Sequence, residues 1–226
     1  MNLPLITIRP EPGASETVRS AAAMGLEVES WPLSKVVPLP WQAPDAAEFD
    51  SLLLGSANAV RHGGPQLREL LALPVYAVGE RTAEAARDIG LQVAQTGPGS
   101  LQPLLDGLAG QNLRLLRLAG EARVAVEPLD SIMVTTVVVY RVEHLPIPPS
   151  LAERLTEGAT VLFHSAEAAA HFSAECTRLQ LPRKRICLAA LSPRIAEAAG
   201  EGWRAVAVAE DQALLEAAAQ LQEHRT

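Results

Sequence analysis

The sequence predicts an α/β protein built as two small doubly wound domains with parallel sheets, joined by a two-stranded β linker. Two observations carry this prediction: the composition and an internal repeat. The chain has 226 residues, of which 48% are hydrophobic and only 4% aromatic. The apolar residues are mostly Ala, Leu and Val in short runs separated by Gly and Pro, which is typical of strands and helices arranged in layers. This length suits one large or two compact domains.

The internal repeat places the same order of elements in the middle and at the end of the chain. Three pairs of corresponding turn residues lie 109, 113 and 112 positions apart: Ser56 with Ser165, Gly79 with Ser192, and Gly90 with Gly202. Offsets this constant indicate an internal duplication. We therefore expect two similar domains.

Within each copy, strands and helices alternate over short connections. The first copy is expected to contain strands at 51–54, 75–78 and 92–94 and helices at 83–89 and 100–108. The second copy is expected to contain strands at 160–163, 186–191 and 203–208 and helices at 196–199 and 211–221. This alternation favours parallel strands joined by right-handed crossovers.

Two further strands are expected outside the repeat, at 3–8 and 113–118, the first followed by an amphipathic helix at 14–24. An extended segment follows each of them, at 34–40 and 137–148, rich in β-branched residues or ending in proline. We interpret these two segments as linker strands between the domains. The chain then starts in one domain, crosses to complete the second and returns to finish the first.

Charge and hydropathy exclude several functional classes. The formal net charge is −7 and there is no run of Lys and Arg, which argues against nucleic-acid binding. The longest apolar stretches fall far short of the roughly 18 residues that span a bilayer. The first ten residues do not form a secretory signal. We expect a cytoplasmic protein with no membrane span.

The reactive side chains do not form a known cofactor or nucleophile motif. Cys176 and Cys187 have no companion Cys or His at ligand spacing, so they are expected to be buried thiols rather than a disulfide or metal site. The five His residues accompany no Ser or Cys nucleophile motif. The glycines form no phosphate loop. Triad, metal and nucleotide-cofactor chemistry are therefore disfavoured.

Six short segments are spread in order over most of the chain: Ile8-Arg9-Pro10-Glu11-Pro12, Asp50 with Gly55-Ser56-Ala57-Asn58-Ala59-Val60, Ala77-Val78-Gly79-Glu80-Arg81-Thr82-Ala83, Val138-Val139-Tyr140-Arg141, Phe163-His164-Ser165 and Leu191-Ser192-Pro193. In order and spacing, this set resembles the uroporphyrinogen-III synthase family. No single segment identifies the family, and the ordered set together with the repeat carries the resemblance.

The resemblance implies two α/β domains with a β-strand linker and an active cleft between the domains. It implies a first domain that combines residues 1–33 with 149–226 and a second that spans residues 41–136. It implies conversion of hydroxymethylbilane to uroporphyrinogen III, with inversion of ring D through a spirocyclic intermediate, as a step of haem biosynthesis. The family uses no metal and no organic cofactor. The implied partner is the substrate hydroxymethylbilane, and the upstream hydroxymethylbilane synthase is a second candidate partner. We expect a monomer.

The chain departs from the family pattern at three places. Ile8 stands where the family usually has Thr before Arg-Pro. The segment Ser192-Pro193-Arg194-Ile195-Ala196 replaces a frequent Gly-Pro-Thr-Thr-Ala. The missing hydroxyl at Ile195 argues against a catalytic role there. The stretch 118–134 is also short for the helix expected in that region.

Candidate substrate-binding residues lie at the turns that follow the strands of the repeat. Ser56, with Ala57 and Asn58 after it, and Ser165 begin equivalent helices, where a hydroxyl and free amides bind a carboxylate. A plain capping role is equally compatible with both serines. At the second turn, the resemblance favours binding by Gly79 and Thr82 over a simple tight turn with a capping threonine. Ser192 is the corresponding residue of the second copy.

Tyr140 is the candidate general acid, because a phenol donates a hydrogen bond to a departing hydroxyl without carrying charge. The alternative to this catalytic role is that Tyr140 only packs on the linker strand. Arg9 and Arg194 are candidate partners of substrate carboxylates, although solvated surface arginines have the same pattern. His164 is not expected to act with Ser165, because adjacent residues of an extended chain point in opposite directions.

Two other functions fit parts of this pattern. A non-catalytic two-lobed binding protein or sensor uses the same duplicated α/β architecture. A nucleotide-dependent enzyme on a Rossmann-like scaffold ranks last, since both the phosphate loop and the ribose-binding acid are missing.

Overall fold

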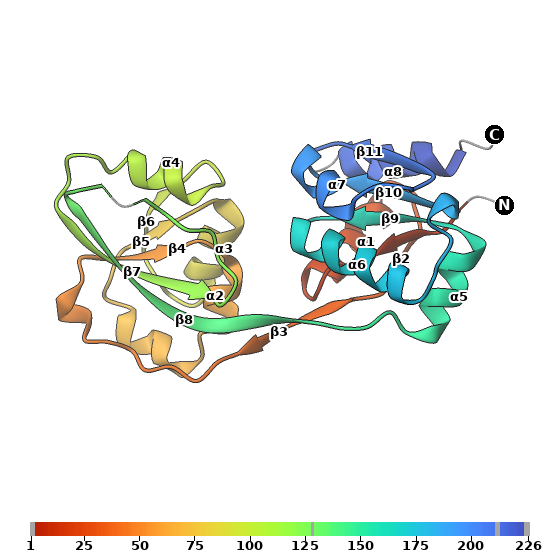
Figure 1. Cartoon of the computed structure of the whole chain (residues 1–226). Coiled ribbons are helices and arrows are strands. Elements are labelled where there is room, and N and C mark those ends of the chain that lie inside the picture. The colour runs from red at the N-terminus through yellow and green to blue at the C-terminus, as the bar shows by residue number, and fades with distance from the viewer. Residues whose placement is uncertain (1–2, 128, 211–212, 224–226) are drawn as a thin grey trace. The chain divides into compact units, whose positions relative to one another are not determined.

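The computed structural model describes residues 3–127, 129–210 and 213–223. The chain divides into two compact units. The first unit comprises Met1–Lys35 and Glu143–Thr226, and the second comprises Val36–Val142. The chain thus begins in one unit, builds the other and returns to complete the first (Figure 1).

The first unit contains a five-stranded sheet of order β11-β10-β9-β1-β2. All neighbouring strands pair in parallel. The strands are β1 (Leu5–Thr7), β2 (Val28–Ser30), β9 (Ala159–Phe163), β10 (Ile186–Ala190) and β11 (Ala205–Val208). The helices are α1 (Gly13–Ala23), α5 (Pro149–Glu157), α6 (Ala166–Arg178), α7 (Pro193–Ala199) and α8 (Ala213–Glu223), with a short 3-10 helix, η3 (Arg183–Arg185).

Helices cover both faces of this sheet, which explains why its central strands are almost entirely apolar. Every residue of β9 and β10 is buried. On one face, Leu162 packs with Ala21 of α1 and Leu214 of α8. On the other, Phe163 packs against Phe172 of α6, with ring centroids 5.4 Å apart. A parallel sheet buried on both faces requires such continuous apolar strands.

The second unit contains a six-stranded sheet of order β3-β8-β7-β4-β5-β6. Strand pairs β8/β7, β7/β4, β4/β5 and β5/β6 are parallel. The strands are β3 (Ser34–Pro38), β4 (Ser51–Leu54), β5 (Val75–Ala77), β6 (Val93–Thr96), β7 (Leu113–Gly120) and β8 (Ile132–His144). The helices are α2 (Ala57–Arg61), α3 (Glu80–Asp88) and α4 (Leu101–Asp106), with 3-10 helices η1 (Ala46–Glu48) and η2 (Pro65–Leu70).

The core of the second unit also lies on both faces of its sheet. Leu52 and Leu54 of β4 point to the face covered by α2, η2 and α3, where Leu70 and Ala83 are fully buried. Leu53 points to the opposite face, where α4 covers it. Side chains that alternate along β4 therefore enter two separate apolar clusters.

The two sheets confirm the predicted α/β class with parallel strands. The order β7-β4-β5-β6 in the second unit corresponds to β1-β9-β10-β11 in the first. In each sheet, the strand before the first serine of the repeat, β4 or β9, lies between a strand outside the repeat, β7 or β1, and the next strand of the repeat, β5 or β10. The two extended segments expected to connect the domains contain β3 and most of β8, which lie at one edge of the second sheet.

Several element boundaries differ from the sequence prediction. Helix α3 begins at Glu80 rather than at residue 83, because Gly79 is its N-cap. No helix is present in the described part of 121–131, because this segment is too short for a crossover helix and its turns. Helix α5 was not predicted. The start of the helix expected at 211–221 lies outside the described residues, and α8 begins at Ala213.

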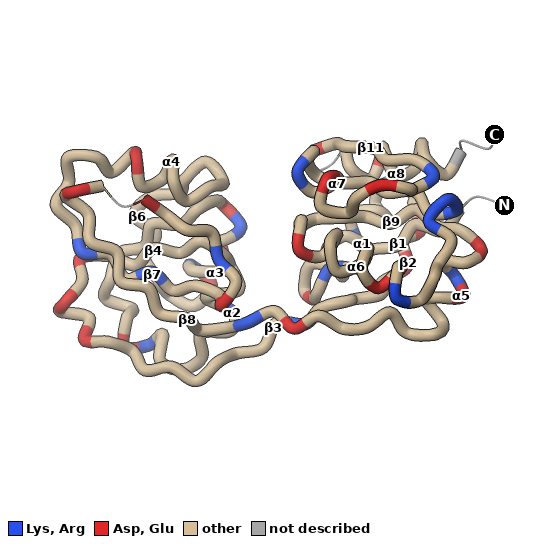
Figure 2. Tube along the Cα trace, viewed as in Figure 1, with Lys and Arg blue, Asp and Glu red and all other residues tan. Residues whose placement is uncertain are grey.

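Both cysteines are buried free thiols, as predicted. Burial raises the pKa of Cys176 to about 12 and also raises the pKa of Cys187. In the described part of the chain, no helix is both long and apolar enough to cross a membrane. Basic and acidic residues are interspersed over both units (Figure 2).

Candidate functional site

Each sheet has one point at which the chain leaves two neighbouring parallel strands in opposite directions. This point lies between β4 and β7 in the second unit and between β1 and β9 in the first. Ligands of open α/β sheets bind outside the carboxyl ends of the strands at such a point. Ser56 follows β4 and Ser165 follows β9, so the two predicted serines occupy equivalent places.

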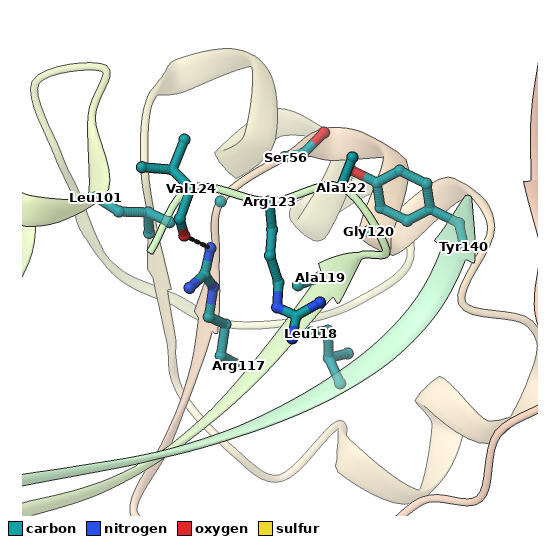
Figure 3. Close-up of a pocket in the computed structure, with 11 residues that line it drawn as sticks. Ser56, Leu101, Arg117, Leu118, Ala119, Gly120, Ala122, Arg123, Val124 and Tyr140 are labelled. Carbon is teal, nitrogen blue, oxygen red and sulfur yellow. Dashed lines mark hydrogen bonds between the residues drawn. The ribbon is translucent and has the colours of Figure 1, made fainter. Parts of the chain in front are cut away.

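A pocket of about 180 Å³ opens at this point of the second sheet. Its walls are formed by the turn after β4, the end of β7, the loop after β7 and a side chain of β8 (Figure 3). Two residues predicted from the sequence, Ser56 and Tyr140, line it together. Arg117 and Arg123 also line it, and neither was predicted.

Ser56 is the N-cap of α2. Its backbone is extended, and its Oγ accepts a hydrogen bond from the amide of Asn58 at 3.2 Å. Ala57 and Asn58 form the first two positions of the helix and are half-buried. The capping role considered from the sequence is therefore present, and Ser56 also lines the pocket.

Tyr140 lies across the end of β7 and is 8% exposed. The pairing of β7 with β8 shifts register between Ala119 and Gly120, so Gly120 lies opposite Tyr140. A Cβ at Gly120 would lie only 2.7 Å from Cζ and 3.0 Å from Oη of Tyr140. Glycine at this position therefore allows the ring to contact the strand backbone. The sequence analysis missed Gly120, because a register shift has no local sequence signal.

Arg117 is a charged residue in the buried part of β7 and is only 5% exposed. Its Nη2 donates a hydrogen bond to the carbonyl of Val124 at 2.9 Å (Figure 3). Burial lowers the pKa of Arg117, the nearby charge of Arg123 lowers it further, and Tyr140 raises it. The available sequence signal was a single arginine among leucines, in Leu115-Leu116-Arg117-Leu118.

His62 is a further titratable group near the pocket. Its ring centroid lies 6.4 Å from that of Tyr140. Burial lowers the pKa of His62, and the positive charge of Arg61 lowers it further. The neutral imidazole is therefore favoured beside the tyrosine.

Gly79 and Thr82 lie at the neighbouring turn, after β5. Gly79 is extended, with φ −169°, and a Cβ there would make only an ordinary contact of 3.6 Å with Cα of Gly99. The fold itself therefore does not require glycine at this position. Thr82 is buried in the first turn of α3, and the cap is Gly79. Thr82 is thus not the capping residue considered from the sequence.

In the first unit, the predicted residues also lie after the carboxyl ends of neighbouring strands. Ser165 is the N-cap of α6, and its side chain accepts a hydrogen bond from the amide of Ala168 at 3.2 Å. Ser192 is the N-cap of α7 without a side-chain cap hydrogen bond. Arg194, in the first turn of α7, is exposed.

Arg9 differs from the other candidates because its side chain folds back onto its own unit. Its Nη1 donates a hydrogen bond to Oγ1 of Thr17 at 3.2 Å. Its guanidinium covers Gly13, where a Cβ would lie 2.5 Å from Nε of Arg9. This geometry gives Arg9 a structural contact at the start of α1.

A larger hollow of about 700 Å³ lies in the first unit, beside the amino ends of β1 and β2. Three carboxylates line it, those of Glu27, Glu29 and Glu157. Its one arginine, Arg154, is bound to Glu29. This acidic lining disfavours an anionic ligand, so the pocket of the second unit is the better candidate.

Comparison with known proteins identifies the family of this chain. The family model described as Uroporphyrinogen-III synthase HemD matches residues 15–217. The chain belongs to the uroporphyrinogen-III synthase family. It is therefore an enzyme of haem biosynthesis, as the resemblance implied.

Solved structures show the same fold. The uroporphyrinogen-III synthetase of Helicobacter pylori is similar with a TM-score of 0.65 and 19% identity, over 97% of this chain and 99% of that one. A mutant uroporphyrinogen III synthase of Thermus thermophilus is similar with a TM-score of 0.50 and 16% identity, over 95% of this chain and 96% of that one. No curated protein matches the chain in a sequence comparison.

Proposed function

We propose that this chain converts hydroxymethylbilane into uroporphyrinogen III with inversion of ring D. Loss of the terminal hydroxyl as water gives an azafulvene, with the electron pair supplied by the pyrrole nitrogen. The substituted carbon of ring D then attacks to give a spirocyclic pyrrolenine, which fragments and recombines. Membership of the family, over residues 15–217, is the observation that carries this proposal.

In this proposal, Tyr140 donates a hydrogen bond to the departing hydroxyl. Three features support the assignment. The phenol lines the pocket, its ring is held against Gly120, and it is almost completely shielded from solvent. A shielded donor is stronger than one that competes with water, and a neutral donor does not attract the substrate carboxylates away from their own sites.

The turns after the strands are proposed to bind the substrate carboxylates. The residues are Ser56, Ala57, Asn58, Gly79 and Thr82 in the second unit and Arg9, Ser165, Ser192 and Arg194 in the first. A net charge of −7 repels an octacarboxylate at long range. Binding must therefore depend on local hydroxyls, amides and arginines, which hold a flexible chain in a folded conformation.

The test is an analysis of product isomers. Freshly prepared hydroxymethylbilane is incubated with and without the protein, and the products are oxidised to porphyrins and separated. Type III porphyrin that depends on the protein supports the proposed reaction. If a folded protein yields only the spontaneous type I isomer, the proposal fails and a non-catalytic two-lobed binding protein becomes the better interpretation.

A further inference from the structure

Arg117 carries a buried positive charge without a carboxylate partner among the described residues. It is 95% shielded from solvent, since its exposed fraction is 5%. Among the described residues, its one hydrogen bond joins Nη2 to the carbonyl of Val124. Its buried Nε has no hydrogen-bond partner in this part of the chain. Buried charges and buried donors are normally paired, because an unpaired one is costly to desolvate. Together, the unpaired charge and the unpaired Nε–H of Arg117 indicate that an acceptor binds here.

The position of Arg117 indicates where that acceptor would bind. The residue lies near the carboxyl end of β7 and lines the pocket between the turn after β4 and the loop after β7. Arg123 lines the same pocket from the loop and is close enough for its charge to lower the pKa of Arg117 (Figure 3). Two like charges that converge on one cavity are stabilised when an anion binds between or beside them.

The size and lining of the pocket limit the chemical class of the anion. About 180 Å³ accommodates a carboxymethyl or carboxyethyl arm but not a pyrrole chain. A guanidinium presents planar, forked donors that match a carboxylate. The unpaired Nε–H of Arg117 supplies a further donor, and the hydroxyl-bearing residues Ser56 and Tyr140 line the same pocket.

We propose that this pocket binds one carboxylate arm of the substrate, held mainly by the guanidinium of Arg117 with Arg123 at the exposed side. The identity of the arm as part of a linear tetrapyrrole rests on the proposed function. The presence of a carboxylate site rests on the geometry alone. Arg117 then anchors the substrate beside Tyr140 and fixes the position of the reacting end.

A binding experiment tests the site without relying on turnover. The probe is sodium propionate, added to protein labelled with ¹⁵N in its arginines, with sodium chloride at the same ionic strength as the control. The Nε–H resonance of Arg117, assigned by its loss in Arg117→Met and Arg117→Lys, is expected to shift with saturation only in propionate. No shift, or an equal shift in chloride, would overturn the proposal.

Steady-state kinetics with hydroxymethylbilane provide the second test. Arg117→Met keeps much of the side-chain volume and is expected to raise KM about tenfold or more, with a smaller change in kcat. The KM of Arg117→Lys should lie between the values of Arg117→Met and the wild type, because lysine keeps the positive charge but lacks the forked donors of the guanidinium. The matched control is Arg114→Met on the same strand, an exposed arginine that pairs with Asp50, which should keep the wild-type KM.

The outcomes separate this inference from the proposed function. If propionate shifts the Arg117 resonance but the wild type makes no type III product, the carboxylate site is supported and the proposed reaction is contradicted. If the wild type makes type III product, Arg117→Met keeps the wild-type KM and propionate causes no shift, then only the carboxylate site is contradicted. If Arg117→Met does not fold, the propionate titration of the wild type still tests the carboxylate site, with Arg117→Lys used to assign the resonance.

Discussion

At the scale of single residues, the candidate site depends on close contacts that few substitutions would preserve. Tyr140 lies against the backbone at Gly120, and both residues belong to the wall that contains Arg117. Ser56 and Tyr140, which line the pocket, were predicted from the sequence because one follows a strand of the repeat and the other belongs to a family-like segment. Arg117 and Gly120 were missed because their importance comes from contacts between β7 and its neighbours.

Gly120→Ala is expected to slow turnover by displacing the ring of Tyr140. The added Cβ would approach two ring carbons and the phenol oxygen of Tyr140 to 3.0 Å or less, so the ring must rotate away, at a cost of about 1–3 kcal/mol in stability. We expect kcat to fall about tenfold and the double variant with Tyr140→Phe to be no slower than the slower single variant. Gly107→Ala is the control, because its nearest contact is an ordinary 3.4 Å. Additive losses would contradict a shared mechanism.

Gly79→Ala separates a role in binding from a role in the fold. The backbone is extended and a Cβ has room, so the thermal unfolding midpoint should not change. If the substrate approaches this backbone, KM should rise about two- to tenfold, as expected for one lost or lengthened hydrogen bond. Differential scanning calorimetry and initial rates measure the two effects. An unchanged KM would show that Gly79 does not take part in substrate binding.

At the scale of elements, the segment that returns from β8 is fixed to α6 by one carboxylate. Glu175 accepts hydrogen bonds from Nε and Nη2 of Arg178 at 2.6 and 2.7 Å and from the amide of Ile147 at 2.9 Å. Its side chain is largely buried, which would otherwise destabilise the charge. The ion pair and the amide together orient the chain where it enters α5.

This carboxylate predicts a loss of stability in acid. The hydrogen bond from Arg178 is the main cause that lowers the pKa of Glu175 to about 2, and the Ile147 amide contributes further. A carboxyl group with a lowered native pKa stabilises the fold above its unfolded pKa, and this contribution is lost as the pH falls from about 4.5 to about 2. It is of the order of 2–3 kcal/mol after allowance for the exposed Arg178.

Urea unfolding at pH 7, 4 and 3 measures this contribution. The wild type should lose it on acidification, whereas Glu175→Gln should be less stable at pH 7 and show a smaller acid loss. Glu153→Gln, an exposed substitution on α5, serves as the control and should follow the wild type. Equal acid losses in wild type and Glu175→Gln would show that other carboxylates dominate.

Sequence patterns predicted the strands of the repeat better than the helices around them. Buried apolar runs such as those of β4 and β9 identify strands directly. Helix α5 was overlooked although Leu151 and Leu155 lie one turn apart and are both fully buried. The connection from β7 to β8 has no helix in its described part, because β8 begins at Ile132 and leaves too few residues.

At the scale of the whole molecule, the two sheets share one order of parallel strands, and Ser56, Ser165 and Ser192 begin the helices that follow the carboxyl ends of these strands. The repeat predicted this arrangement, because equivalent positions of a duplicated sequence take equivalent places in two similar sheets. We expect most of the rate enhancement to come from binding and holding the substrate, and a smaller part from hydrogen-bond donation by Tyr140.

The most direct test of this division is the rate and isomer composition of the product made by Tyr140→Phe. Loss of one hydrogen-bond donor should lower kcat by about 10- to 100-fold, while the enzymatic product stays type III, because the held conformation directs the inversion. Circular dichroism verifies that the variant is folded. A folded Tyr140→Phe that forms no type III product above the spontaneous background would contradict the account and make Tyr140 the principal source of catalysis.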